Sequence, residues 1–333
     1  MTSTLHLGDC LDVMRTLDAD SVDAVVTDPP SGINFMNREW DGHKGGRAQW
    51  IAWLSERLAE AHRVAKPGAR LLCWAIPRTS HWTGTAIEDA GWIIEDRLAH
   101  LFGTGMPKAQ SRLKPSVEDW WLARKASKGV PPLNIDACRI EGMVPQVTQG
   151  VTRRAADGTA VYGQGHDIRR VPQLSNPHTL GRWPANLVLD EEAAAMLDAQ
   201  TGTLKSGALE QSSVKAKSLG YGFDGYANPK TYEPSSGGAS RFYYCPKASK
   251  SDRGEGNIHP TVKSHNLMRW LVRLIAKPGD LLLDPFAGSG STALACQAEG
   301  VRFVGVEQSA EYHAIAEARI RAAEQAKGEL LFA

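Results

Sequence analysis

Two stretches of the chain repeat one pattern of apolar and polar positions, an amphipathic helix followed by Lys-Pro-Gly and a short apolar strand. Residues 50–65 place apolar side chains at helical spacing, and the strand ARLLCWA follows the break at residues 66–68. Residues 267–276 give a second helix, and DLLLD at residues 280–284 follows the second break. Helices that alternate with buried strands predict an α/β fold with a doubly wound, mostly parallel sheet.

Two of the apolar strands end in an aspartate and a turn. One is VVTDPPSG at residues 25–32, and the other is LLLDPFAGSGST at residues 281–292. In an open parallel sheet, ligands bind beyond the carboxyl ends of the strands, so two such ends suggest one shared site. The second strand continues through a glycine turn into a helix at about residues 291–299, and the next strand, VRFVGVE, ends at Glu307. A carboxylate at that place commonly binds ribose hydroxyls, so this segment predicts half of a nucleotide-binding unit.

The glycine turn alone leaves the cofactor open. Gly288 and Gly290 let the backbone approach a ligand, but their spacing also fits an NAD site, so an NAD-dependent dehydrogenase is one alternative. The Asp-Pro-Pro step points elsewhere. Each proline fixes its φ and lacks an N–H donor, so the Asp28 carboxylate and the Pro29 carbonyl are presented at a fixed angle. Such a pair of acceptors can bind both hydrogens of an amino group.

In this order along the chain, the motifs resemble those of the β-class amino-methylating DNA methyltransferases, site-specific enzymes that methylate adenine N6 or cytosine N4. DPFAGSGST resembles their cofactor loop, LHLGDCLDVM at residues 5–14 the segment that faces the adenine of the cofactor, and HPTVKSHNLMRWLVRLI at residues 259–275 the helix entry before the loop. Because DPP lies upstream and the cofactor loop downstream, the implied fold is a circularly permuted, Rossmann-like S-adenosylmethionine-dependent methyltransferase fold. FMNREWD at residues 35–41 and RFYYCPKASKSDR at residues 241–253 are similar to phage and prophage methylases.

This resemblance implies a cofactor, a partner and a division of the chain. The cofactor is S-adenosylmethionine, with S-adenosylhomocysteine as the product and no metal. The partner is double-stranded DNA, in a restriction-modification setting, and a homodimer is left open. The implied parts are a catalytic half at residues 1–125, a loop-rich insert for target recognition at residues 126–250 and a cofactor-binding half at residues 251–333. The implied cofactor-binding residues are Asp9, Cys10, Thr261, Lys263, Asp284, Pro285, Phe286, Gly288, Ser289, Gly290, Thr292, Glu307 and Gln308.

The catalytic residues that the resemblance implies are Asp28, Pro29, Pro30 and Ser31. An exocyclic amine is a poor nucleophile because its lone pair is delocalised into the ring, so Asp28 and Pro29 would activate it by orienting it toward the methyl group. The target base must leave the duplex, and an aromatic side chain should help to hold it. The family usually has that aromatic residue after Pro-Pro, where this chain has Ser31. We therefore predict that Phe35 or Trp40 stacks on the flipped base.

The sequence leaves open which base or molecule is methylated. Asp before Pro-Pro is more typical of adenine enzymes than of cytosine enzymes in this family, which favours adenine N6 and leaves cytosine N4 as the alternative. A methyltransferase acting on RNA or on a protein amide would use similar acceptors. A DNA-binding protein without activity is a further alternative, because Ser31 cannot stack.

Composition narrows the remaining classes. The chain has 38 Lys+Arg and 37 Asp+Glu, and this net charge of +1 neither proposes nor excludes DNA. The five cysteines lie far apart without a C-x-x-C, which disfavours a zinc site or a disulfide framework and indicates a reducing cytoplasm. No Pro-Cys dipeptide occurs, which disfavours cytosine C5 chemistry. We also expect a soluble protein, because the sequence shows no signal peptide and no apolar run near the roughly 18 residues that span a bilayer.

Overall fold

The computed structural model describes residues 3–35, 38–42, 44–103, 105, 113–140, 181–206, 209–210, 231–232, 235–246, 257 and 262–332. The chain forms two compact units. Unit 1 comprises Met1–Cys138, Pro184–Met196 and Tyr243–Ala333, and unit 2 comprises Arg139–Trp183 and Leu197–Phe242.

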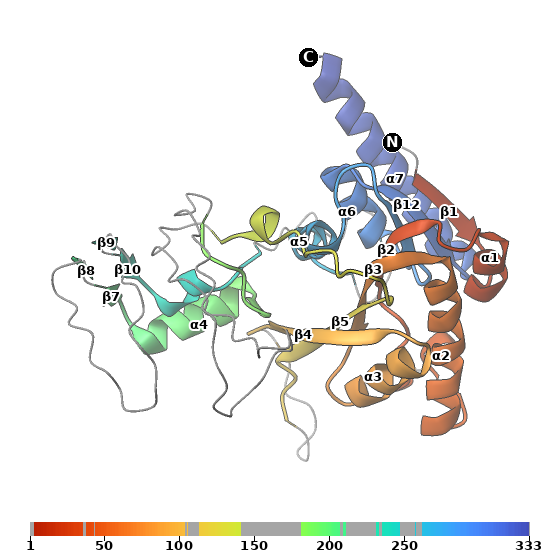
Figure 1. The fold of residues 1–333 in the computed structure, drawn as a ribbon, viewed down its shortest axis with the longest axis horizontal. Coiled ribbons are helices and arrows are strands. Elements are labelled where there is room, and N and C mark those ends of the chain that lie inside the picture. Colours follow the sequence, from red (N-terminus) through yellow and green to blue (C-terminus); the bar gives the residue numbers. More distant parts are fainter. Residues whose placement is uncertain are drawn as a thin grey trace, which may run out of the picture. The chain divides into compact units, whose positions relative to one another are not determined.

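Unit 1 is built on an eight-stranded sheet. In spatial order its strands are β1 (Ser3–Leu7), β12 (Arg302–Glu307), β11 (Leu281–Asp284), β2 (Val22–Thr27), β3 (Ala65–Ala75), β5 (Val117–Arg124), β4 (Ile93–Leu101) and β6 (Leu187–Leu189). The first five strands pair in parallel, β5 is antiparallel to both of its neighbours, and β6 is parallel to β4. Strands from the two ends of the chain thus lie side by side (Figure 1). The predicted α/β fold with a mostly parallel sheet is confirmed.

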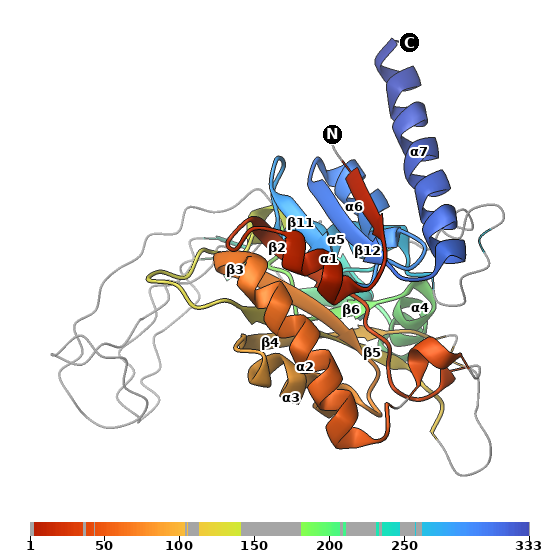
Figure 2. The same ribbon diagram turned by 90° about the vertical axis from the view of Figure 1, so that its right-hand side faces the viewer.

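Helices cover both faces of this sheet (Figure 2). On one face lie α1 (Cys10–Thr16), α2 (Arg47–Val64) and α3 (Ser80–Asp89), and on the other lie α5 (His265–Ile275) and α6 (Ser291–Glu299). The strands alternate accordingly: Leu71 and Cys73 of β3 point into the first core, whereas Leu72 and Trp74 point into the second. The long helix α7 (Ala310–Phe332) joins the second core through Ile320.

The helix predicted at residues 50–65 is confirmed as α2, which begins three residues earlier, at Arg47. Its buried side chains follow helical spacing and pack on the first core. The second predicted helix is confirmed as α5, and its Lys-Pro-Gly turn joins α5 to β11. The first Lys-Pro-Gly segment is different, because β3 begins at Ala65 and includes it. A register shift between β2 and β3, from the pair Val22–Ala65 to the pair Ala24–Arg70, accommodates these residues, with Gly68 at φ 82°.

Unit 2 contains short antiparallel ladders. The strand β7 (Leu204–Ser206) pairs with β10 (Ser235–Gly237), and β8 (Leu209–Glu210) pairs with β9 (Thr231–Tyr232). The helix α4 (Glu191–Thr201) begins in unit 1 and ends in unit 2. Unit 2 lies within the segment predicted as the target-recognition insert, much of which is outside the described residues, and its role remains a prediction. No helix in the described part of the chain is long and apolar enough to cross a membrane.

Candidate active site

A cavity of about 1130 Å³ opens in unit 1 beyond the carboxyl ends of β11 and β2. This is the place at which an open parallel sheet binds its ligands. Seventeen of the residues predicted from the sequence line it, namely Asp9, Cys10, Asp28, Pro29, Pro30, Ser31, Phe35, Trp40, Lys263, Asp284, Pro285, Phe286, Gly288, Ser289, Thr292, Glu307 and Gln308. The two strand ends therefore share one cavity, although their motifs lie more than 200 residues apart in the sequence.

Asp284, at the end of β11, is buried and fixes the start of the glycine turn. Its Oδ2 accepts a hydrogen bond from Thr292 Oγ1 at 2.6 Å. Its Oδ1 accepts from Thr27 Oγ1 at 3.0 Å and from the backbone N–H of Phe286 at 3.1 Å. Burial raises the pKa of Asp284 to about 7, although these three hydrogen bonds favour the charged form. Because both oxygens are engaged within the chain, Asp284 organises the loop, and a direct contact with a cofactor remains a prediction.

Glu307, at the end of β12, holds the turn from the other side. Its Oε2 accepts from the N–H of Gly288 at 2.9 Å, and its Oε1 accepts from the N–H of Ser309 at 2.7 Å. Burial raises the pKa of Glu307 despite these bonds. Gly290 does not line the cavity: it has φ 82° at the start of α6, and a Cβ there would lie 3.1 Å from the Cβ of Ala316. Its predicted contact with a cofactor remains a prediction, and Thr261 lies outside the described residues.

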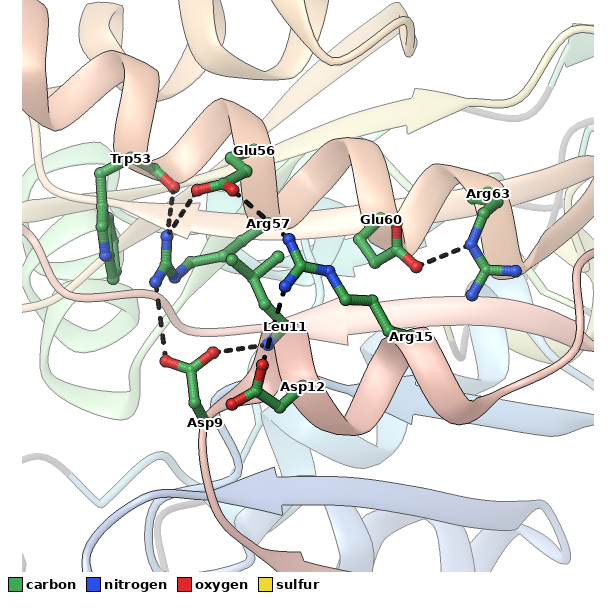
Figure 3. Close-up of polar contacts among 9 residues, drawn as sticks. All are labelled: Asp9, Leu11, Asp12, Arg15, Trp53, Glu56, Arg57, Glu60 and Arg63. Carbon is green, nitrogen blue, oxygen red and sulfur yellow. Dashed lines mark hydrogen bonds and ion pairs between the residues drawn. The ribbon is translucent and has the colours of Figure 1, made fainter.

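Asp9 lies where β1 passes into α1 and also lines the cavity, next to the Gly8 N–H that donates to the backbone oxygen of Glu307. Its Oδ1 accepts from the N–H of Leu11 at 2.8 Å and so caps the helix. Its Oδ2 lies 3.6 Å from a guanidinium nitrogen of Arg57, which reaches across from α2 (Figure 3). The guanidinium also lies over the ring of Trp53, 4.4 Å from its centroid, and Trp53 packs against Phe286 with 5.8 Å between ring centroids.

Arg57 and Trp53 were not predicted as site residues. Both residues fit the helical pattern of α2, and that pattern does not reveal that the middle of this helix borders the cavity. Cys10 was predicted and lines the cavity beside them. Burial raises the pKa of its thiol to about 12, so Cys10 stays protonated and is no nucleophile.

Asp28, which follows β2, lines another part of the cavity. Its Oδ2 lies 3.2 Å from Lys263 Nζ, and Glu118 Oε2 lies 3.8 Å from the same nitrogen. The ammonium lies over the face of Trp74, 3.7 Å from the ring centroid. Burial raises the pKa of Asp28 to about 6, although Lys263 favours the ionised form. Burial acts in the same direction on Glu118, but Lys263 and the neighbouring His100 outweigh it and lower its pKa to about 2.

The loop after Pro-Pro is closed by Asp41, a fully buried side chain that sequence reasoning missed. Its carboxylate accepts from the hydroxyl of Ser31 at 3.0 and 3.2 Å and from three backbone N–H groups, those of Gly32, Ile33 and Phe35. Gly32 has φ 72°, and a Cβ there would lie 2.5 Å from Trp50 Nε1. Ser31 is therefore part of the support of the loop. Asp41 falls within FMNREWD, so the motif was visible in the sequence but its structural role was not.

The two aromatic residues predicted to stack on a base, Phe35 and Trp40, both line the cavity and are only partly buried. Their role remains a prediction. Among the described residues, no group of three or more His, Cys, Asp and Glu side chains is arranged to hold a metal ion.

The mostly parallel sheet and the cavity at its strand ends match the predicted fold of an S-adenosylmethionine-dependent methyltransferase. A family model described as DNA methylase, the N6/N4 methyltransferase model, matches residues 22–318. This match covers most of the chain, and the chain therefore belongs to the N6/N4 family of DNA methyltransferases.

Individual relatives agree with this assignment. Over 64 residues the chain is 41% identical to the type II methyltransferase M2.DpnII of Streptococcus pneumoniae. The aligned segment covers 19% of this chain and 24% of that protein. The chain spans less than a third of the length of the curated relatives that it matches. The structure is similar to that of the cytosine-N4-specific PvuII DNA methyltransferase, with a TM-score of 0.55, 14% identity, and coverage of 95% of this chain and 86% of that one. It is also similar to TTHA0409 of Thermus thermophilus in complex with S-adenosyl-L-methionine, with a TM-score of 0.51, 15% identity, and coverage of 96% and 94%. At these identities the two structures establish the fold.

Proposed function

We propose that the chain transfers a methyl group from S-adenosylmethionine to the exocyclic amine of a flipped base in double-stranded DNA. One observation carries the proposal. Asp28, the carbonyl-bearing Pro29 and the glycine turn after Asp284 line a single cavity at the ends of two adjacent parallel strands. The cavity is as large as pockets that enclose a ligand of cofactor size.

The residues of the glycine-turn side fit S-adenosylmethionine. When bound, this cofactor supplies a methyl group on a positively charged sulfur. Glu307, held by backbone N–H groups at the end of β12, is placed to accept hydrogen bonds from ribose hydroxyls. Phe286, Trp53 and Asp9 provide apolar faces and a carboxylate for an adenine ring. Family membership and the S-adenosylmethionine complex of TTHA0409 support this assignment.

Asp28 and Pro29 would act on the target amine. The Asp28 carboxylate and the Pro29 carbonyl accept its two hydrogens, which fixes the amine and turns its lone pair toward the methyl group. An ionised Asp28 also stabilises the positive charge that develops on nitrogen. Since its pKa lies near 6, the same carboxylate can take up the proton that the methylated amine releases.

Adenine N6 is the proposed target, because the family resemblance of Asp-Pro-Pro favours it. Cytosine N4 stays the alternative. The likeness to a phage methylase and a pairing with a restriction enzyme, as the type II name of M2.DpnII suggests for that protein, also remain proposals.

The deciding experiment incubates unmethylated DNA with the full chain and methyl-labelled S-adenosylmethionine, then analyses nucleosides by mass spectrometry. Labelled N6-methyladenine is the expected product. Labelled N4-methylcytosine would move the target to cytosine. Label on RNA or protein, with none on DNA, would refute the proposed substrate.

A further inference from the structure

The Asp28 side of the cavity presents a hydrogen-bond donor next to an acceptor. Lys263 Nζ lies 3.2 Å from Asp28 Oδ2, and only 10% of the Lys263 side chain is exposed. An ammonium group has three N–H donors, and Asp28 and Glu118 take at most two of them. Both Lys263 and Asp28 line the cavity, so a ligand that reaches Asp28 also meets the ammonium.

This order of groups matches one edge of two bases. On the Watson–Crick edge of adenine the N6 amine lies next to N1, and on that of cytosine the N4 amine lies next to N3. In both bases the amine donates and the adjacent ring nitrogen accepts. A flipped base is commonly bound through this edge. Asp28 as acceptor and Lys263 as donor therefore present the same pattern as the lost partner base, and a separation of 3.2 Å suits two parallel hydrogen bonds.

The surrounding charges make a lysine compatible with methyl transfer. Alone, an ammonium beside Asp28 would cancel the negative charge that stabilises a positively charged amine. Glu118 supplies a second carboxylate 3.8 Å from the ammonium, so the three groups together carry a net charge of −1 when all are ionised. Trp74 holds the ammonium over its ring face, and His100 lies 3.7 Å from Glu118 on the neighbouring strand.

We propose that Lys263 donates a hydrogen bond to the ring nitrogen beside the target amine, with Glu118 balancing its charge. This inference rests on the proposed function and names how that site selects its base. It requires an amine next to an unprotonated ring nitrogen. On the Watson–Crick edge, guanine carries a hydrogen on the ring nitrogen beside its amine, and thymine has no exocyclic amine, so neither base presents this pattern there.

The test removes the acceptor on the base and the donor on the protein. Sequencing of DNA methylated by the enzyme identifies the methylated site, and the target adenine is then replaced by 1-deazaadenine, or a target cytosine by 3-deazacytosine. Single-turnover methyl transfer is measured with the unaltered chain and with Lys263→Met. The analogue also alters the reactivity of the amine. The informative quantity is therefore a ratio: the fold-loss of methyl-transfer rate from the natural to the deaza base in the unaltered enzyme, divided by the same fold-loss in Lys263→Met. We expect this ratio to be about tenfold or more, as for a hydrogen bond to a charged group.

A ratio near one, with normal transfer to the natural base, would overturn the inference and leave the proposed function intact. So would a large loss of S-adenosylmethionine affinity in Lys263→Met together with a ratio near one, since Lys263 would then bind the carboxylate of the cofactor. If no DNA is methylated at all, the proposed function fails and this inference falls with it.

Two controls isolate the contact. Lys263→Arg keeps the charge and a donor and should preserve the preference for the natural base. Lys66→Met removes another ion-paired ammonium, 2.6 Å from Asp23 and outside the cavity, and should behave as the unaltered chain. If Lys263→Met does not fold, binding of the unaltered chain decides the matter. A duplex whose target faces an abasic position needs no base pair to open, and we expect about tenfold weaker binding with the deaza base, whereas equal affinity would overturn the inference.

Discussion

The acid limb of the methylation rate should shift in opposite directions when the two charged neighbours of Asp28 are removed. Burial raises the pKa of Asp28 to about 6, Lys263 counteracts that rise, and Glu118 and Asp41 add to it. The amine is bound best by an ionised carboxylate, so the rate should fall as the pH drops below about 6. At pH 5 only about a tenth of Asp28 would be ionised.

The two variants differ in sign and in size. Lys263→Met removes the ammonium at 3.2 Å, and an opposite charge at such a distance typically lowers a carboxyl pKa by about one to three units. Its loss should therefore move the acid limb to higher pH by that amount. Glu118→Gln removes a like charge and should move the limb to lower pH. We expect about one unit or less, because the Glu118 carboxylate already pairs with the same ammonium.

Single-turnover rates across roughly pH 4.5 to 9 at saturating cofactor would measure the acid limb in each variant. Shifts of the two limbs in the same direction would refute the assignment of Asp28 as the titrating acceptor. An unchanged limb in both variants would do so as well. Lys66→Met, whose ammonium pairs with Asp23 outside the cavity, is the matched control and should leave the limb in place.

Three further predictions concern the loops that hold the site. Asp41→Ala should lower the free energy of unfolding by about 3 kcal/mol in chemical denaturation, because it leaves buried donors of the loop without their acceptor, and a loss below about 1 kcal/mol would contradict this role. Phe35→Ala or Trp40→Ala should weaken binding of the flipped base by about 1 to 3 kcal/mol, and Ser31→Tyr should not raise single-turnover methylation, since a gain would mean that no other aromatic holds the base. Asp284→Asn should flatten the decline of stability between about pH 4 and 7. The raised pKa of Asp284 means that the folded state binds the proton more tightly, so its contribution is present at low pH and lost as the pH rises through about 7. Parallel curves for variant and parent would refute this.

Much of the sheet could be predicted because the hydrophobic pattern itself carries it. The helix α2, the glycine turn and the strand ends at Asp28, Asp284 and Glu307 all follow from local spacing. Their convergence on one cavity also follows, because parallel strands present their carboxyl ends at the same edge. The first Lys-Pro-Gly segment differed, because pairing with β2 extended β3 through it.

The other half of the site could not be predicted, since its residues meet only through the fold. Glu118 and His100 lie opposite each other on β5 and β4, and Lys263 approaches them from the start of α5. No local motif brings these three together. The sequence suggested a cofactor contact for Lys263, and the structure places its ammonium beside Asp28.

The turn after Asp28 differs by one backbone hydrogen bond from the turns after the other strand-end carboxylates. Asp9, Asp284 and Glu307 each accept a hydrogen bond from the backbone N–H two residues later, at 2.8, 3.1 and 2.7 Å. The residue two positions after Asp28 is Pro30, which has no N–H. The position two residues later therefore cannot cap Asp28, which favours the proposed contact of its carboxylate with an amine.

Pro30→Ala tests this argument, because it supplies the missing N–H. If the new N–H donates to Asp28, it should lower the pKa of that carboxyl, move the acid limb of the methylation rate to lower pH and reduce turnover by about tenfold or more. Pro285→Ala is the matched control, since it changes the first residue after Asp284 and leaves the bond from Phe286 in place. It should leave the acid limb of the methylation rate in place. An equal loss in both variants, with no shift of the acid limb in Pro30→Ala, would show that proline stiffens the turn and does nothing to keep Asp28 uncapped.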